Sequence, residues 1–136
     1  MPVLHMIDTS AVAAIVTGAG DVLARMKALP PTSVCMSALT RAELLHALND
    51  YPASHRVHLV ADQLIKIIRA LPWDAGAADW LAQILPAANR ANAMIGELDL
   101  MVAAHALALG AVLVTCQPAT FEQIEAPLTI DGWSVQ

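Results

Sequence analysis

The chain has 136 residues, of which 57% are hydrophobic and only 14% charged, and its formal net charge is −5. Soluble domains carry about 25% charged residues, so we predict a single domain, residues 1–136, that leaves apolar surface for a partner or a second copy. The seven lysines and arginines are scattered along the sequence, so the sequence shows no basic run of the kind that attracts nucleic acid, and composition alone argues mildly against a nucleic-acid partner.

The sequence predicts a cytoplasmic protein without a disulfide framework. Its two cysteines, Cys35 and Cys116, lie in apolar segments and are too few for such a framework. The N-terminal apolar stretch contains Asp8 and no basic leader, so we do not expect a signal peptide. The uncharged segment 100–121 is long enough to suggest a membrane span. Gly110 divides it, however, and a helix followed by a buried strand explains it better.

The pattern of apolar residues predicts short strands that alternate with helices. In the first half of the chain we predict a strand at 3–7, helices at 10–17 and 21–29, a strand at 33–36, a helix from the N-cap Ser37 to about residue 49, and an amphipathic helix at 54–71. In the second half we predict a break or very short strand at 71–73, a helix from the cap Asp74 to about residue 85, a loop at 87–96, a helix at 97–109, a strand at 111–115, a short helix at 120–124 and a strand at 128–130. Pro86 is expected to kink or end its helix.

This alternation indicates βαβ units, and therefore a three-layer α/β/α sandwich on a mainly parallel sheet. In such sheets, ligands collect at the carboxyl ends of the strands. Asp8 and Gln117 follow predicted strands directly, and the helix capped by Ser37 begins at the end of another. The sequence thus predicts a polar site at this edge of the sheet.

Three acidic residues, Asp8, Glu43 and Asp99, stand next to small or hydroxylated residues at a strand end or near a helix start. A lone acid in apolar surroundings is costly to bury, so three of them suggest a shared cation. Each also has an ordinary structural interpretation: Asp8 as an N-cap, Glu43 in a capping box with Thr40, and Asp99 as an acid that complements a helix dipole. The sequence alone leaves both interpretations open.

Hydroxyl and amide side chains accompany these acids. Thr9 or Ser10 and Thr115 are expected to orient ligands or water, although Thr115 is equally typical of an ordinary strand residue. Gln117 offers a neutral oxygen. His105 is more typical of a buried helix histidine bonded to a neighbour than of a general base. The sequence has no zinc-ligand spacing, no Gly-rich phosphate loop and no G-x-S-x-G motif.

Four segments of the sequence resemble the PIN-domain family and, within it, the VapC-type ribonuclease toxins of bacterial toxin–antitoxin pairs. They are MIDTS at 6–10, SALTRAELL at 37–45, ELDLMVAAHA at 97–106, and LVT at 113–115 followed by FEQI at 121–124. Their order and spacing match over essentially the whole chain, down to Trp133. The resemblance implies an α/β/α sandwich, a homodimer, Mg²⁺- or Mn²⁺-dependent endonucleolytic cleavage of RNA, and an antitoxin that wraps the toxin and blocks its site.

The resemblance further implies that Asp8, Glu43 and Asp99 hold the metal, directly or through water, with Thr115 and Gln117 completing the site. The family commonly has Thr-x-Asn or Thr-x-Asp after the fourth strand, where this chain has Gln117. We therefore expect one tightly held ion, with a second arriving with substrate if at all. The alternative is a catalytically weakened PIN domain that acts as a binding module. A third possibility, an acidic phosphotransfer domain, would need a second acid near Asp8.

Overall fold

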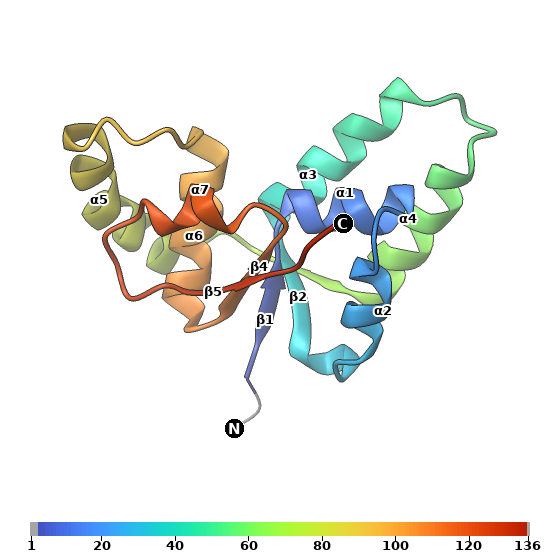
Figure 1. Cartoon of the computed structure of the whole chain (residues 1–136), viewed down its shortest axis with the longest axis horizontal. Helices are drawn as coiled ribbons and strands as arrows, with labels where there is room; N and C mark the ends of the chain where they lie inside the picture. The colour runs from blue at the N-terminus through green and yellow to red at the C-terminus, as the bar shows by residue number, and fades with distance from the viewer. Residues whose placement is uncertain (1–2, 136) are drawn as a thin grey trace.

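A computed structural model describes residues 3–135, and Figure 1 shows their course. The strands are β1 (His5–Ile7), β2 (Val34–Ser37), β3 (Arg69–Leu71), β4 (Val112–Thr115) and β5 (Thr129–Gly132). The helices are α1 (Thr9–Thr17), α2 (Val22–Lys27), α3 (Ala38–Ala47), α4 (Arg56–Ile67), α5 (Ala75–Arg90), α6 (Glu97–Leu109) and α7 (Pro118–Glu122), with short 3-10 helices at Pro31–Ser33 and Leu48–Asp50. The predicted alternation of strands and helices is confirmed.

Across residues 3–135, the five strands form one parallel sheet in the order β3-β2-β1-β4-β5. The central strand β1 pairs on both sides, with Met6 opposite Cys35 of β2 and Leu113 of β4. The chain leaves β1 toward β2 and later returns to the other side of β1 as β4. The connections therefore diverge at the carboxyl end of β1, which is where sheets of this type bind ligands.

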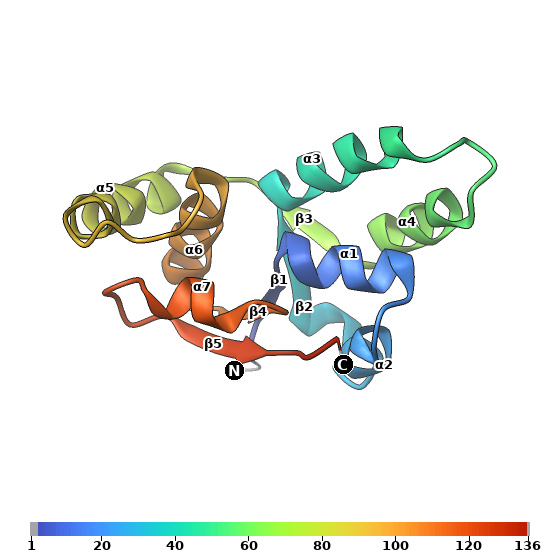
Figure 2. The ribbon, with the colours of Figure 1, turned by 45° about the horizontal axis from the view of Figure 1, so that its top comes forward.

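Two helical layers cover the sheet, and the alternation of side chains along each strand assigns them. Ile7 packs with α1, α2, α3 and α4, whereas its neighbour Met6 packs with α5, α6 and α7. Figures 1 and 2 show these two groups of helices on opposite sides of the strands. The three-layer α/β/α sandwich predicted from the sequence is confirmed.

The amphipathic helix predicted over 54–71 ends earlier than expected. Helix α4 ends at Ile67, and β3 follows as an edge strand whose Arg69 pairs with Cys35 of β2. Ile68, which is 2% exposed, fits the helical spacing of apolar residues and also the buried turn into the strand. Hydrogen bonding to the open edge of β2 therefore overrides a periodicity that by itself favours a longer helix.

The prediction that a helix ends near residue 85, with a loop from residue 87, was also wrong; a kink at Pro86 stays a prediction. Helix α5 continues through Pro86 to Arg90. A proline in this position leaves the carbonyl of Ala82 without its helical donor. Ala82 and Pro86 are both exposed, so water can satisfy that carbonyl, and the last turn packs Ala88 into the core beside α6.

The uncharged segment 100–121 divides between α6 and β4, as predicted, and Gly110 caps α6 in the left-handed conformation. None of the helices in residues 3–135 is long and apolar enough to cross a membrane.

The C-terminal segment closes against the loop between α1 and α2. The backbone N–H of Trp133 donates to the carbonyl of Thr115 at 2.8 Å, and the Arg25 guanidinium lies 5.3 Å from the Trp133 ring. Gly20 has a φ of +60°, and a Cβ at this position would lie 2.7 Å from the Cα of Val135. The close approach of these two backbones requires glycine.

Gly20→Ala is therefore expected to destabilise the protein by about 2–4 kcal/mol, since it adds a backbone clash to the strain of a left-handed alanine. Gly110→Ala is the matched control, because Gly110 has a φ of +62° and no atom within 4 Å of the added Cβ. It should cost only the strain, about 1–2 kcal/mol. Urea unfolding measures both, and equal losses would contradict the tight contact with Val135.

Candidate active site

Asp8 lies at the centre of the carboxyl edge of the sheet. It follows β1 directly, is 3% exposed, and caps α1 by accepting a hydrogen bond from the Ala11 N–H at its Oδ1 (2.9 Å). The Ser10 hydroxyl donates to the same oxygen at 2.7 Å. The N-cap interpretation of Asp8 is thus confirmed, and the cap fixes this carboxylate at the switch point of the sheet.

Glu43 approaches this edge from α3. Ser37 caps α3 by accepting the Leu39 N–H at 3.2 Å, which places Glu43 in the second turn. The Thr9 hydroxyl donates to Glu43 Oε1 at 2.6 Å and so links the beginning of α1 to α3. The capping box of Thr40 with Glu43 is not formed, because Thr40 lies inside the helix and its buried hydroxyl has no partner in the described part of the chain.

Asp99 comes from the first turn of α6, and its electrostatics show that the three acids share one region. Burial raises the pKa of Asp99, and the negative charges of Asp8 and Glu43 raise it further. Burial also raises the pKa of Asp8, against the opposing hydrogen bonds from Thr115, Ser10 and Ala11. For residues 3–135, no lysine or arginine is among the groups that shift either pKa. Within the described residues, the site is therefore a concentration of negative charge in which no lysine or arginine lowers the pKa of Asp8 or Asp99.

The Ser10 hydroxyl connects Asp8 to the end of β4. It accepts the Cys116 N–H at 2.9 Å and lies 3.2 Å from the Thr115 hydroxyl. Thr115 in turn accepts the Gln117 N–H at 3.0 Å and is fully buried. Its hydroxyl therefore makes a hydrogen bond at the end of β4 in addition to filling a buried strand position. The Gln117 side chain is exposed.

The donors at this edge are carboxylate and hydroxyl oxygens, which suit a hard cation such as Mg²⁺ or Mn²⁺. No group of three or more His, Cys, Asp or Glu side chains in residues 3–135 is close enough to enclose a metal ion by itself. Mg²⁺ usually keeps several waters and is held by only one or two carboxylates. The residues therefore fit an ion bound partly through water, and they do not fit a closed structural metal site.

His105 of α6 lies behind the acidic edge. It is 1% exposed, and its Nδ1 is 2.9 Å from the Ser37 hydroxyl. Burial lowers its pKa, with the Asp74 charge and a backbone hydrogen bond at Pro72 acting in the opposite direction. The prediction of a buried, hydrogen-bonded histidine is confirmed. His105 ties α6, which carries Asp99, to the beginning of α3, which carries Glu43.

The hydroxyls of Ser37, the N-cap of α3, and Thr40, inside α3, are expected to differ in their contribution to stability. Thr40→Val should leave the free energy of unfolding unchanged or raise it by up to about 1 kcal/mol, because the buried hydroxyl has no partner. Ser37→Ala removes the cap of α3 and the partner of His105, and should cost about 2–3 kcal/mol. Thermal unfolding of both variants measures the change in stability. A large loss of stability in Thr40→Val would contradict the absence of a hydrogen-bond partner for the Thr40 hydroxyl within the described residues.

A wide surface pocket of about 480 Å³ lies beside Glu43, between α3 and α6, and is open to solvent. We call it the α3–α6 cavity. Its lining includes Leu39 and His46 of α3, Leu98 of α6 and Thr9 of α1. No feature of the sequence predicted this cavity, and Ser10 was predicted only as an alternative to Thr9 for orienting ligands or water. Leu39, Glu43 and His46 recur at four and three residues, a spacing that places them on one helix face and could have indicated a shared surface.

Comparison with known proteins agrees with this arrangement. The family model described as "PIN domain" matches residues 5–126. A curated relative from Shigella flexneri, named "tRNA(fMet)-specific endonuclease VapC", is 30% identical over 101 residues, which cover 74% of this chain and 76% of the relative.

Two solved structures share the fold. The DNA-bound VapBC structure from Salmonella typhimurium matches with a TM-score of 0.84 and 28% identity, over 96% of this chain and 98% of the other. VapBC2 from Rickettsia felis, bound to a promoter DNA fragment, matches with a TM-score of 0.86 and 19% identity, over 96% and 99% of the two chains. Sequence, topology and site geometry lead to the same conclusion: the chain belongs to the PIN-domain family, with VapC proteins among its relatives.

Proposed function

We propose that this protein is a metal-dependent endoribonuclease and the toxin of a type II toxin–antitoxin pair. The observation that carries the proposal is the coupling of acids at the switch point of the sheet, where the charges of Asp8 and Glu43 raise the pKa of Asp99. Within residues 3–135, no lysine or arginine is among the groups that shift the pKa of Asp8 or Asp99. The name of the Shigella flexneri relative, a tRNA-specific endonuclease, supports RNA as the substrate.

In the proposed reaction, Asp8, Glu43 and Asp99 hold the divalent ion, directly or through water. When bound there, Mg²⁺ or Mn²⁺ would supply a water of lowered pKa for attack on the phosphorus and would offset negative charge on the phosphate. Ser10 and Thr115 keep the carboxylate of Asp8 in place through the hydrogen bonds that join β1, α1 and β4. Their contribution is to orient the site before substrate arrives.

The neutral side chain of Gln117 bears on how many metal ions the site binds. Gln117 follows β4, where many members of the family have an acidic or asparagine side chain, and it contributes no charge. We propose that one ion is held by the protein and that any second ion arrives with the RNA. Gln117 would act as a neutral oxygen ligand only if its exposed side chain turns toward the edge.

We also propose a cognate antitoxin and a homodimer, both acting in the cytoplasm. The support for a protein partner is the apolar surface of this small chain, with Leu59 and Ile67 of α4 63% and 56% exposed and Leu45 of α3 45% exposed. The VapBC neighbour from Salmonella typhimurium favours an antitoxin as that partner.

A second candidate is a catalytically weakened PIN domain that works as a binding module. The observations that favour it are the neutral Gln117 and the spacing of the acids, which do not enclose an ion by themselves within residues 3–135. This candidate predicts RNA binding without cleavage.

The test is a cleavage assay with the whole purified protein on initiator tRNA, elongator tRNAs and a structured control RNA. The proposal predicts cleavage at defined positions in Mg²⁺ or Mn²⁺ and none in EDTA. Binding without cleavage under every metal condition would favour the binding module, and cleavage that persists in EDTA would contradict a metal-dependent site.

A further inference from the structure

The α3–α6 cavity is continuous with the acidic edge. Thr9 and Glu43, which hydrogen bond to each other, belong to both. The remainder of the lining is mainly apolar, from Leu39, Ala42 and Leu98, and His46 adds one imidazole ring. The cavity and the acidic edge therefore adjoin at Thr9 and Glu43.

Size decides which neighbouring cavity can receive part of a nucleotide. Pockets for small organic ligands measure about 300–1,000 Å³, and the α3–α6 cavity, at about 480 Å³, lies in that range. A second cavity that also includes Thr9 and Glu43, in the groove between α1 and α3, measures about 80 Å³. It is too small for a ring system.

The charge of the surrounding residues favours the base over the phosphate of a nucleotide in the α3–α6 cavity. Glu43 lines the cavity and raises the pKa of Asp99, and no lysine or arginine of residues 3–135 is among the groups that shift the pKa of Asp8 or Asp99. A phosphate would therefore be repelled beyond the point where a metal ion neutralises it. A nucleobase carries no charge. It can place its faces against apolar side chains and an imidazole ring, as bases do in single-stranded RNA recognition.

We propose that the α3–α6 cavity binds one nucleobase of the RNA strand, next to the phosphodiester that is cleaved. Leu39 and Leu98 form its apolar walls, and His46 contributes a stacking surface and a ring nitrogen for hydrogen bonding to the base edge. This inference rests on the proposed ribonuclease function and assigns a base-binding subsite to it. His46 and Leu98 act in substrate binding and not in the chemical step.

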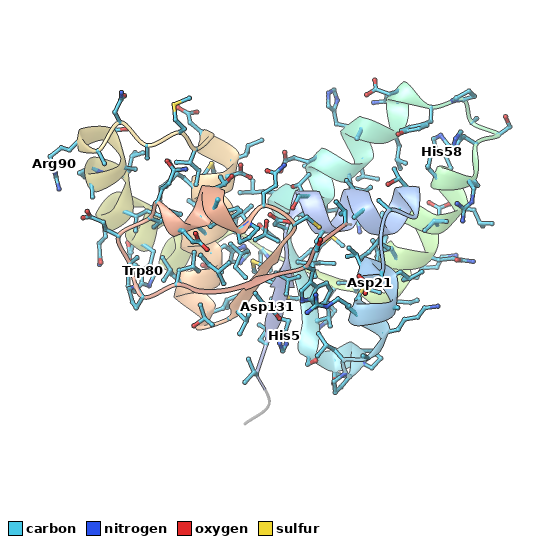
Figure 3. The ribbon with its side chains drawn as sticks, in the orientation of Figure 1. His5, Asp21, His58, Trp80, Arg90 and Asp131 are labelled. Atoms are coloured by element: carbon cyan, nitrogen blue, oxygen red, sulfur yellow. The ribbon has the colours of Figure 1, made fainter. Side chains whose placement is uncertain are left out.

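The kinetic test uses His46→Ala and Leu98→Ala, with initiator tRNA as the first substrate. Each variant should raise KM about tenfold, the size of one lost base stack, while kcat changes less than about twofold. His58→Ala is the matched histidine control, since His58 lies on α4, away from α6 (Figure 3). Leu109→Ala is the matched leucine control, because Leu109 lies at the other end of α6 and is 41% exposed, close to the 43% of Leu98. Both controls should behave like the parent.

An abasic substrate separates base binding from a general structural effect. Each of the two nucleotides that flank the cleaved bond is replaced in turn by an abasic ribose. For one of these RNAs, the parent, His46→Ala and Leu98→Ala should have the same KM, because the base that they bind is absent. A tenfold difference that persists on both abasic RNAs, or no difference on the intact RNA, would overturn the proposal.

A titration with uncharged nucleosides tests the cavity without any cleavage. Adenosine, guanosine, cytidine and uridine are added separately to the whole protein, and NMR follows the methyl groups of Leu39 and Leu98. At least one nucleoside should shift both methyl signals in the parent and not in His46→Ala. If the parent cleaves no RNA but these shifts occur, the ribonuclease proposal fails and the base subsite stands. If RNA is cleaved but no nucleoside shifts these signals, the subsite alone is overturned.

A protein occupant gives a different result. If Leu98→Ala changes the sedimentation of the protein, while the nucleosides leave the Leu39 and Leu98 signals unchanged, the cavity is a contact between protein chains and the nucleobase proposal is wrong.

Discussion

Asp8→Asn and Asp99→Asn are each expected to reduce RNA cleavage by at least about a hundredfold, although both proteins fold. Asparagine keeps the shape of the side chain but removes the charge that holds a divalent ion. At position 8 it also keeps the cap of α1, because asparagine caps helices as well as aspartate does. The loss of activity therefore reports on the charge at the acidic edge and not on the fold. Single-turnover cleavage of the parent's best RNA substrate measures it.

The same two variants should be more stable than the parent in EDTA, by about 0.5–1 kcal/mol. Burial raises the pKa of Asp8 and Asp99, and the neighbouring acids raise that of Asp99 further. A carboxyl with a raised folded-state pKa costs stability above that pKa. The metal-free parent should thus lose stability as the pH rises from the ordinary value of 3.8 through the raised values, and each variant should lose less.

Asp62→Asn on the exposed surface of α4 is the control for both measurements and should match the parent. Retained cleavage in Asp8→Asn and in Asp99→Asn would remove the basis for a metal-dependent site. Reduced cleavage together with reduced stability would instead indicate that the acids support the fold.

His105→Ala is expected to lower the free energy of unfolding by about 3 kcal/mol, a large fraction of the stability of a domain of this size. The substitution leaves a cavity beneath the acidic edge and removes the partner of the Ser37 hydroxyl, which lies 2.9 Å from Nδ1. Urea unfolding at pH 7.5 measures the loss. His58→Ala, at a partly exposed position on α4, should cost much less.

His105 also predicts the direction of a pH dependence. Burial lowers its folded-state pKa below the ordinary value of 6.5, so the folded protein prefers the neutral ring. The contribution of the neutral His105 ring to the free energy of unfolding is complete above pH 6.5, and it is lost as the pH falls through the lowered folded-state pKa. The parent should therefore become less stable relative to His105→Ala as the pH falls from 7.5 to 5. If the difference in free energy of unfolding between the two proteins does not change with pH, the pKa of His105 is the same in the folded and unfolded states, which contradicts this prediction.

The sequence predicts the fold well where spacing and end signals agree. Helix α6 has the predicted bounds, because acids stand in its first turn and Gly110 follows its end. Ser37 is the cap of α3, as expected from its position after a buried strand. The alternation of strands and helices was enough to predict the parallel sheet and the edge at which the acids meet.

Other features depend on tertiary contacts that no local pattern contains. The strand β3 exists because β2 offers it an open edge, and its three residues carry no strand signal that outweighs the preceding helix. Helix α5 passes Pro86 because water can reach the freed carbonyl and Ala88 packs against α6. The link from Thr9 to Glu43 joins residues that are 34 positions apart, so it could not be predicted from either segment alone.

The three acids of the candidate site could be predicted from the sequence, but the residues and the cavity around them could not. Asp8, Glu43 and Asp99 were singled out from their neighbours in the sequence, and the structure brings them within electrostatic reach of one another. The roles of Ser10, which joins Asp8 to the end of β4, and of the α3–α6 cavity required the packed chain.

The most direct test of this account is a titration of the whole protein with Mn²⁺, followed by electron paramagnetic resonance of the free ion. We expect one saturable Mn²⁺ site per chain in the parent. The affinity should be weakened at least about tenfold in Asp8→Asn and in Asp99→Asn, and it should stay close to that of the parent in Asp62→Asn. Unchanged Mn²⁺ affinity in both active-site variants would contradict the claim that these acids hold the ion on which cleavage depends.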